Sequence, residues 1–172
     1  MLSVIILCGF GGVAMRPDAV VRTLAPLVGA SVRGQVRDVV LAGPPEAGLE
    51  IIAQHAGCAI VEAATEAEAL RGAVAAARTG DLMFLRAGYV PQAGFFEEIE
   101  DLLNSRGLDS VGRAVKTVPV TLFQRMFPEF APVVGFIAAR SLCAVADRSS
   151  FQELRRAAGA RKALQGRLRR IA

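Results

Sequence analysis

Short apolar runs alternate with segments of helical periodicity through the first 104 residues of the chain. The apolar runs have the length of strands and are nearly continuous, which is typical of parallel strands that are buried on both faces. They predict strands over residues 2–7, 36–41, 58–61 and 82–86. Between them, apolar positions recur at spacings of three and four, which predicts helices. These helices are expected to begin near residues 17, 49, 66 and 95.

The alternation of strand and helix predicts the fold class. It is the pattern of an α/β domain whose parallel strands are joined by right-handed crossovers. We therefore expect a three-layer α/β/α sandwich with a mostly parallel central sheet, in which the four strands are neighbours. The second half of the chain is less regular, and there we expect strands within residues 110–120 and over 133–138, and a helix over 141–146.

Two local signals refine the helices. Thr65 and Glu68 have the spacing of a capping box, which indicates the start of the helix expected over residues 66–78. Pro26 lies inside the first helical pattern and has no backbone N–H, so we expect it to kink that helix or to end it early.

The basic charge is concentrated in residues 151–172, which we predict to form a basic C-terminal helix. From Arg148 onward the chain has eight Lys or Arg residues against one acidic residue, whereas the rest has twelve against fifteen. The net charge of +4 therefore belongs to the tail. Two interpretations stay open: peripheral contact of this helix with an anionic membrane surface, or docking on the α/β domain expected over residues 1–150. We expect no nucleic-acid partner, because the body of the chain is acidic on balance.

Composition fits a folded chain with a sizeable core. The 172 residues are 53% hydrophobic with a mean hydropathy of +0.42, which excludes disorder. No apolar run approaches the roughly 20 residues that span a bilayer. The three cysteines are scattered through the chain, which favours a reducing compartment and a cytoplasmic location.

Ligands of open α/β sheets bind outside the carboxyl ends of the strands. The first expected strand is followed by Gly9-x-Gly11-x-x-Ala14, which matches the dinucleotide-binding turn. That site also needs an acidic residue for the ribose at the end of the second strand, where this chain has Ala42 and Gly43. The sequence therefore disfavours a Rossmann dinucleotide-binding protein.

The chain resembles the family 2 glycosyltransferases, which have the GT-A fold and use nucleotide-sugar donors. The resemblance covers about residues 1–104, and residues 128–142 more loosely, by pattern and order rather than by one diagnostic motif. It rests on Ser3–Ile6, Val39–Leu41, Gly48–Ala53 with Ala56–Cys58, Leu70–Leu85 and Pro91–Phe96. What it implies is a transferase that acts with a nucleotide-sugar.

The chain departs from this family at the acidic positions. The family's Asp at the end of the second strand falls near Ala42-Gly43, its Asp-x-Asp falls on Arg86-Ala87-Gly88, and a later acid falls on about residues 133–135. Because a divalent ion needs oxygen ligands, we expect no cofactor and no divalent metal. The resemblance then implies a nucleotide or diphosphate site in which arginine supplies the countercharge. Its residues would be Cys8, Gly9, Gly43, Arg71, Arg86, Ala87 and Gly88.

The catalytic residues stay unknown from the sequence. Glu129 is the only acid between residues 117 and 140, which makes it the candidate general base, and a surface turn after Pro128 is the alternative. Arg86 would then be either a phosphate ligand or a strand-end residue paired with Glu62 or Asp109. A catalytically degenerate homologue, which binds a nucleotide or sugar or acts as an interaction protein, stays open beside an active transferase.

A nucleotidyltransferase of related fold is the second enzyme class. Residues 7–12, leading to Met15-Arg16-Pro17, are similar to the glycine-rich, Arg-containing loop of sugar and cofactor nucleotidyltransferases. Those enzymes also have a lysine shortly after the loop, whereas the lysines of this chain are Lys116 and Lys162. The likeness is therefore incomplete.

Overall fold

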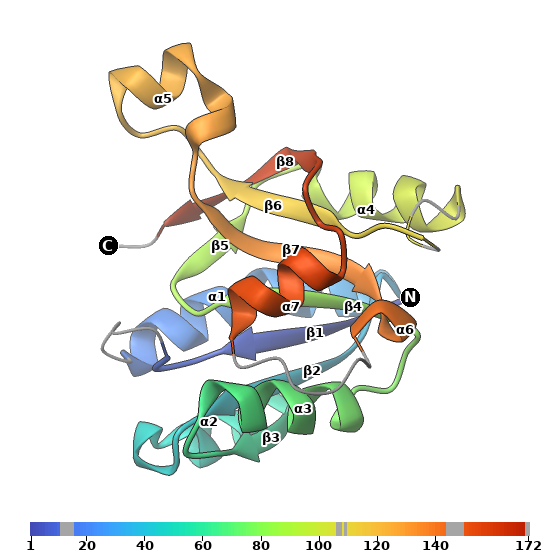
Figure 1. Cartoon of the computed structure of the whole chain (residues 1–172). Helices are drawn as coiled ribbons and strands as arrows, with labels where there is room; N and C mark the ends of the chain where they lie inside the picture. The colour runs from blue at the N-terminus through green and yellow to red at the C-terminus, as the bar shows by residue number, and fades with distance from the viewer. Residues whose placement is uncertain (11–15, 106–107, 109, 144–149, 171–172) are drawn as a thin grey trace.

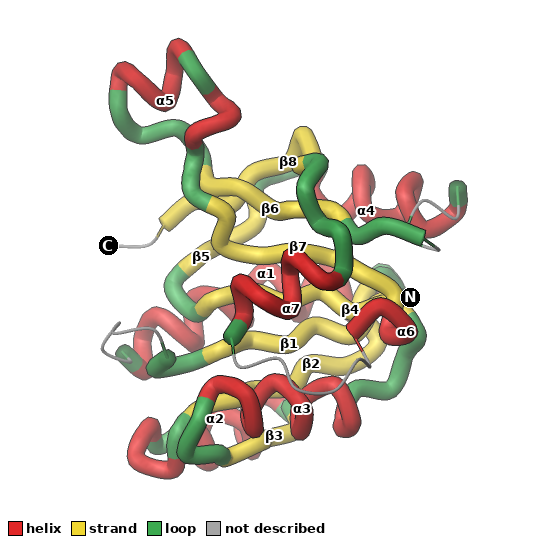
Figure 2. Tube along the Cα trace, viewed as in Figure 1, coloured by secondary structure: helices red, strands yellow, loops and turns green. Residues whose placement is uncertain are grey.

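The computed structural model describes residues 1–10, 16–105, 108, 110–143 and 150–170. These residues form one eight-stranded sheet with helices on both faces (Figures 1 and 2). The strands lie in the order β3-β2-β1-β4-β7-β6-β8-β5. They are β1 (Leu2–Leu7), β2 (Val36–Gly43), β3 (Ala59–Glu62), β4 (Asp81–Arg86), β5 (Tyr89–Pro91), β6 (Arg113–Thr117), β7 (Val133–Ala139) and β8 (Ala163–Arg170).

The four strands predicted from continuous apolar runs are confirmed as neighbours. β2 pairs with β3, and β1 lies between β2 and β4, all in parallel. β4 then pairs antiparallel with β7, and β7 antiparallel with β6. The parallel half of the sheet places the carboxyl ends of β1, β2 and β4 at one edge, where the candidate site lies.

Helices cover the two faces of the sheet, which confirms the α/β sandwich. The helices are α1 (Pro17–Val32), α2 (Leu49–Ala56), α3 (Glu66–Ala76), α4 (Phe95–Asn104), α5 (Leu122–Met126), α6 (Arg140–Cys143) and α7 (Phe151–Ala157), with 3-10 turns η1 (Pro45–Ala47) and η2 (Pro128–Phe130). Of these, α5 and η2 stand away from the sheet (Figure 1). β1 is buried throughout: Val4 and Ile6 share one core with α1, α2 and α4, whereas Ile5 and Leu7 share the other with α3 and α7. This burial on both faces explains why β1 reads as a continuous apolar run.

The structure confirms the capping box and shows that Pro26 does not end the first helix early. The Thr65 side chain accepts from the Glu68 N–H, and the Thr65 N–H donates to the Glu68 carboxylate, at the start of α3. α1, however, continues past Pro26 to Val32. A proline inside a helix costs about 3 kcal/mol, but the buried stripe of α1 on both sides of Pro26 offsets this cost.

The prediction of one basic helix over residues 151–172 is wrong. The tail forms the short helix α7, a turn at Gly159 with φ +67°, and strand β8, which pairs parallel with β6 and antiparallel with β5. Leu164 and Leu168 are both buried. Their spacing of four fits one face of a helix, but it also fits one face of a strand, so the pattern did not distinguish the two.

Both strands expected in the second half are present. β6 lies within the range 110–120, and β7 covers the range 133–138 with one further residue. The helix expected over 141–146 corresponds to α6, and residues 144–149 lie outside the described part. No helix among the described residues is long and apolar enough to cross a membrane.

Candidate functional site

Arg86 is the last residue of β4 and lies at the carboxyl edge of the sheet. It is directly opposite Leu7, the last residue of β1, and Leu7 is in turn opposite Ala42 of β2. Residues 82–85 are buried, whereas Arg86 is only partly buried. The register of the parallel strands therefore brings Arg86 next to the segment that follows β1, with β2 one strand further along the sheet.

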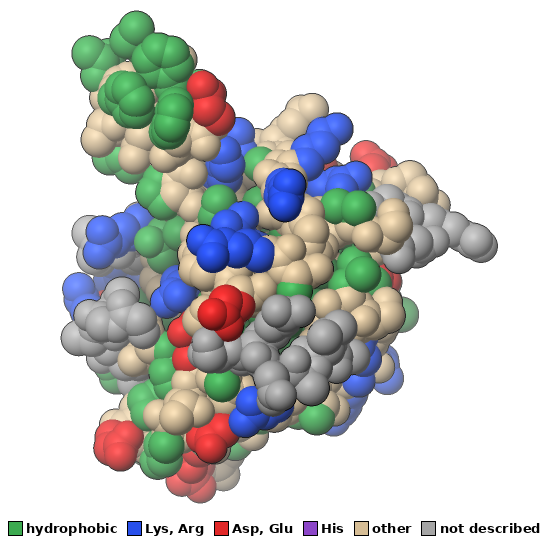
Figure 3. Space-filling view, in the orientation of Figure 1, with side chains coloured by type: hydrophobic (Ala, Val, Ile, Leu, Met, Phe, Trp, Pro, Cys, Tyr) green, Lys and Arg blue, Asp and Glu red, His purple; other side chains and the backbone are tan. Residues whose placement is uncertain are grey.

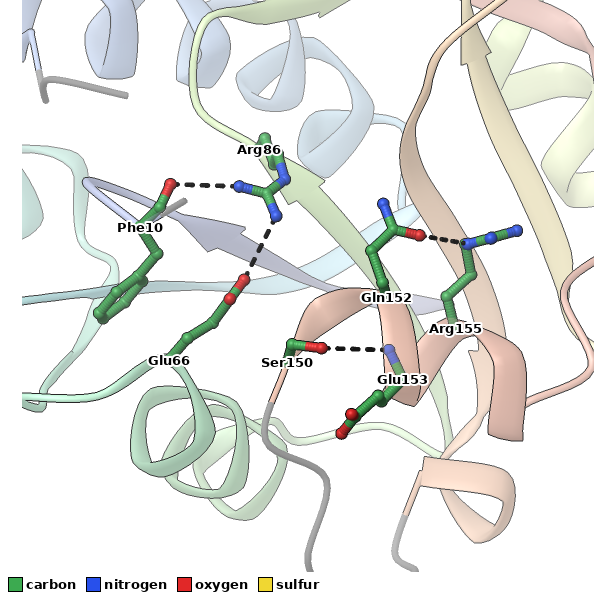
Figure 4. A network of polar contacts seen from close by, with 7 residues as sticks. All are labelled: Phe10, Glu66, Arg86, Ser150, Gln152, Glu153 and Arg155. Atoms are coloured by element: carbon green, nitrogen blue, oxygen red, sulfur yellow. Dashed lines mark hydrogen bonds and ion pairs between the residues drawn. The ribbon is translucent and has the colours of Figure 1, made fainter. Parts of the chain in front are cut away.

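The guanidinium of Arg86 joins the segment after β1 to the start of α3 (Figure 4). Its Nη1 donates to the backbone carbonyl of Phe10 at 3.2 Å, and its Nη2 pairs with Oε1 of Glu66 at 3.4 Å. The side chains of Arg86 and Glu66 are 23% and 17% exposed. The sequence proposed Glu62 or Asp109 as the partner; the structure gives Glu66 instead, and Asp109 lies outside the described residues.

The tail contributes an aromatic ring to this site. The guanidinium carbon of Arg86 lies 5.0 Å from the ring centroid of Phe151, the first residue of α7. Phe151 packs edge-on against Phe136 at 5.2 Å, and Phe136 stacks on Phe84 of β4 at 4.4 Å. A cation over a ring contributes about 0.5–2 kcal/mol, depending on desolvation. Arg86 is thus held by three contacts, with the Phe10 carbonyl, the Glu66 carboxylate and the Phe151 ring.

Cys8 and Gly43 lie against each other at the ends of β1 and β2. A Cβ on Gly43 would lie 2.7 Å from Leu49 Cδ1, 3.0 Å from the Cys8 carbonyl oxygen and 3.3 Å from Cys8 Cβ. A side chain at this position would displace Leu49 or the backbone of Cys8. Burial raises the pKa of the Cys8 thiol to about 12, so this cysteine is a protonated packing residue and a poor nucleophile at neutral pH.

Ala87 and Gly88 form a turn that is fixed to both β1 and α1. The Ala87 N–H donates to the Leu7 carbonyl at 3.0 Å, and the Gly88 N–H donates to the Thr23 hydroxyl at 3.0 Å. Thr23 is fully buried on α1 and donates to the Ala19 carbonyl. Gly88 has φ +92°, a left-handed conformation that favours glycine. The turn is therefore fixed by two hydrogen bonds and carries no side chain larger than the Ala87 methyl.

The structure does not bring together all the predicted residues. Gly9 follows Cys8 with φ +74°, in the segment next to Arg86. Arg71 is exposed on α3, whereas the polar contacts that Arg86 makes among the described residues are with Phe10 and Glu66. Glu129 lies exposed in η2, on a segment that projects away from the sheet (Figure 1), and Lys116 Nζ donates to its backbone carbonyl at 2.5 Å. The rest of the glycine-rich turn, residues 11–15, lies outside the described part.

Three partners of Arg86 were missed by the sequence analysis. Phe10 contributes through its carbonyl, which no sequence pattern marks. Phe151 was assigned to a helix of uncertain position, and Glu66 was seen only as the first residue after the cap Thr65. That cap was the available signal, because it places Glu66 in the first turn of α3, at the same sheet edge as Arg86.

The α/β fold of the described residues matches the fold of solved nucleotide-sugar and nucleotidyl transferases. No family model matches the chain, and no curated protein matches it. Solved structures of this fold do match. Glucosyl-3-phosphoglycerate synthase from Mycobacterium tuberculosis with Mg²⁺ and UDP is 17% identical, with a TM-score of 0.59, covering 91% of this chain and 62% of that one.

Two solved nucleotidyl-transferase-type structures are similar to the same degree. The bifunctional IspDF from Campylobacter jejuni is 15% identical with a TM-score of 0.58, covering 91% of this chain and 46% of that one. HddC from Yersinia pseudotuberculosis is 12% identical with a TM-score of 0.53, covering 88% and 82%. The chain spans a little over half the length of the synthase structures with Mn²⁺ and UDP that it matches. At these identities the likeness establishes the fold.

The expectation that a divalent metal is unfavoured is wrong for this fold. Solved synthase structures of the same fold contain Mn²⁺ or Mg²⁺ together with UDP. The described residues of this chain contain no group of three or more His, Cys, Asp and Glu placed to hold a metal ion. At the carboxyl end of β4 the carboxylate in contact with Arg86 is that of Glu66. The described residues alone therefore do not supply the ligand set of such a metal site.

Proposed function

We propose that the edge formed by the carboxyl ends of β1, β2 and β4 binds the diphosphate of a nucleotide or nucleotide-sugar. The observation that carries this proposal is Arg86, a positioned cation in a fold whose solved examples include UDP complexes. Guanidinium binds phosphate oxygens in a bidentate manner. The class of activity we propose is glycosyl transfer of the family 2 type from such a donor.

The ion pair with Glu66 suggests how Arg86 would receive a diphosphate. A guanidinium has five N–H donors, and the Nη2 donor at 3.4 Å from Glu66 is held by a long contact. A diphosphate carries more charge than one carboxylate, so it would compete for this donor. The contact with the Phe10 carbonyl would keep the guanidinium in place during the exchange.

Turnover is the less supported half of the proposal. Acceptor activation needs a general base, and the candidate Glu129 is exposed in η2. We therefore expect nucleotide binding with slow sugar transfer. Glu129→Gln should leave nucleotide binding unchanged. Multiple-turnover transfer that is lost in Glu129→Gln would show instead a working transferase with Glu129 as its base.

The experiment is calorimetric titration with a panel of nucleoside diphosphates and nucleotide-sugars, each with and without Mn²⁺. Arg86→Ala should weaken binding about tenfold or more, as expected when a charged hydrogen bond is lost. Glu66→Gln should tighten it, by roughly threefold, because the competing carboxylate is removed. Arg37→Ala is the matched control, since Arg37 is exposed near the amino end of β2, at the other edge of the sheet. If Glu66→Gln leaves the affinity unchanged and Arg86→Ala has no effect, Arg86 is a structural strand-end residue.

Nucleotidyl transfer is the second candidate, favoured by the similarity to IspDF and HddC. It would share the diphosphate position but would release pyrophosphate from a nucleoside triphosphate. An assay of pyrophosphate release with sugar phosphates as acceptors distinguishes it from glycosyl transfer, which releases a nucleoside diphosphate.

A further inference from the structure

The segment between β6 and β7 exposes an unusual number of large apolar side chains. It contains α5 and η2 and stands away from the sheet, where the space-filling view shows a hydrophobic tip (Figure 3). We call residues 120–130 the knob. Six of its apolar side chains are 42–75% exposed: Val120, Leu122, Phe123, Met126, Phe127 and Phe130. An exposed apolar cluster of this kind marks an interaction surface.

The knob is ordered by its own contacts. Phe123 lies 5.2 Å from Phe127 and 5.3 Å from Phe130, measured between ring centroids. Thr121 and Gln124 form a capping box at the start of α5. The apolar tip is therefore a preformed shape, and its outer side chains stay in solvent although the rings pack on one another.

Basic side chains gather at the base of the knob. Lys116, near the end of β6, is opposite Arg167 of β8, and the Val118 N–H donates to the Leu168 carbonyl. Arg169 and Arg170 follow on β8, and both are exposed, as is Arg125 on α5. Burial and the charge of Arg167 lower the pKa of Lys116, and Glu129 opposes this shift. Five cations thus lie on or below an apolar tip whose own acidic residue is Glu129.

We propose that the knob docks on an anionic membrane surface, with its apolar tip in the headgroup boundary and the basic residues at its base against the lipid phosphates. Charge complementarity favours an anionic lipid surface, because the five cations on and below the knob repel one another and are stabilised by negatively charged lipid phosphates. Shape favours it too. The tip projects from the sheet and exposes six large apolar side chains, a shape that can enter the headgroup boundary.

The orientation of the docked protein follows from the sheet. β7 begins at Val133, directly after the knob, and its Gly135 pairs with Leu85 of β4. The knob therefore leaves the sheet at the same edge as Arg86. Docking through the knob would turn the candidate site toward the membrane.

The test is sedimentation of the full chain with vesicles of phosphatidylcholine alone or with about 30% phosphatidylglycerol added as the anionic lipid. Wild type should bind the anionic vesicles, bind the neutral ones poorly, and be released by salt. Leu122→Gln/Met126→Gln should reduce binding about tenfold or more, because two apolar side chains lose their transfer free energy. Arg169→Gln/Arg170→Gln should reduce binding to the anionic vesicles and leave binding to the neutral vesicles unchanged.

The matched control is Val28→Gln/Ile51→Gln, which removes equally exposed apolar groups, 63% and 68%, from α1 and α2. It should bind like wild type, and thermal melting should show that every variant is folded. Absence of binding to anionic vesicles by folded wild type would overturn the proposal, as would equal loss in the knob and control variants. A wild-type dimer that becomes monomeric in Leu122→Gln/Met126→Gln would assign the knob to a second copy of the chain instead.

Discussion

Arg86 and Glu66 form a partly buried ion pair that joins the end of β4 to the first turn of α3. The two residues are separated by the whole of α3 and by β4, so the pair fixes how α3 meets the sheet edge. Glu66 also lies in the first turn of its helix, where a carboxylate interacts favourably with the helix dipole. The pair is thus part of the scaffold as well as of the candidate site.

We predict that Arg86→Ala lowers the free energy of unfolding by about 1–2 kcal/mol, through loss of two charged hydrogen bonds and the contact with Phe151. Urea unfolding measures this change. Arg16→Ala is a suitable control, since the Arg16–Asp18 pair is 62% and 43% exposed and should contribute little. Equal effects of the two substitutions would contradict the structural role given to Arg86.

Gly43 provides a test of the close contact between β1 and β2. Gly43→Ala places a Cβ 2.7 Å from Leu49 Cδ1 and 3.0 Å from the Cys8 carbonyl oxygen, and we predict a destabilisation of about 1–3 kcal/mol. Gly80→Ala is the matched control, because a Cβ there meets nothing within 4 Å. In thermal melting, Gly43→Ala should have a lowered melting temperature and Gly80→Ala one close to that of wild type. A wild-type melting temperature for Gly43→Ala would show that the packing around this glycine adjusts easily.

The buried thiols predict a dependence of stability on alkaline pH. Burial raises the pKa of Cys8 and of Cys143 to about 12, whereas the ordinary value is 9.0. The contribution of the two protonated thiols to the free energy of unfolding is therefore fully present below pH 9. It is lost as the pH rises from 9 toward 12, because the thiols of the unfolded chain release their protons first. Between pH 9 and 11 the free energy of unfolding should fall by about 1 kcal/mol per pH unit for each thiol.

Urea unfolding at several alkaline pH values measures this slope. Tyrosine and lysine also titrate in this range, so the comparison is between wild type and Cys8→Ala/Cys143→Ala, whose slope should be shallower. Native thiol labelling provides a second measurement. Cys58 is partly exposed and should react first, and rapid labelling of Cys8 in the folded protein would contradict its burial.

Strand β8 predicts a strong effect of substitutions in the tail. Leu168 is fully buried, and it pairs with Pro91 of β5 and Thr117 of β6. Leu168→Ala should cost about 2–5 kcal/mol, whereas its neighbour Arg169 is exposed and Arg169→Ala should be nearly neutral. Chemical unfolding of the two variants makes the comparison. Equal and small effects would indicate that the tail is peripheral, as a docked or membrane-bound helix would be.

The parallel half of the fold could be predicted from the sequence because its signals are local. Strands buried on both faces produce continuous apolar runs, and Thr65 with Glu68 marks a helix start without reference to the rest of the chain. The tail could not be predicted in the same way. Leu164 and Leu168 have a spacing that two kinds of element share, and the partners that decide between them, β5 and β6, lie far away in the sequence.

The candidate site, too, could be predicted from the sequence only in part. The position of Arg86 at the sheet edge follows from strand register, which the apolar runs determine. Its partners depend on tertiary contacts: the choice of Glu66 over Glu62 depends on where α3 begins and how it lies on the sheet, and Phe151 reaches Arg86 only because α7 packs beside Phe136. The role of Arg86 toward a nucleotide stays a prediction for the binding experiment.

The place of β8 in the sheet has a consequence for synthesis of the chain on the ribosome. β8 lies between β6 and β5 in the strand order, and Tyr89 of β5 is opposite Arg170. β5 is therefore made about 80 residues before the strand it pairs with, whereas β1, β2 and β3 find all their partners, and β4 its partner β1, within the first half. The nascent chain would assemble the parallel half early and would leave the edges of β5 and β6 open until residues 163–170 emerge. Such unpaired edges are where a nascent sheet is most prone to pair with the wrong chain.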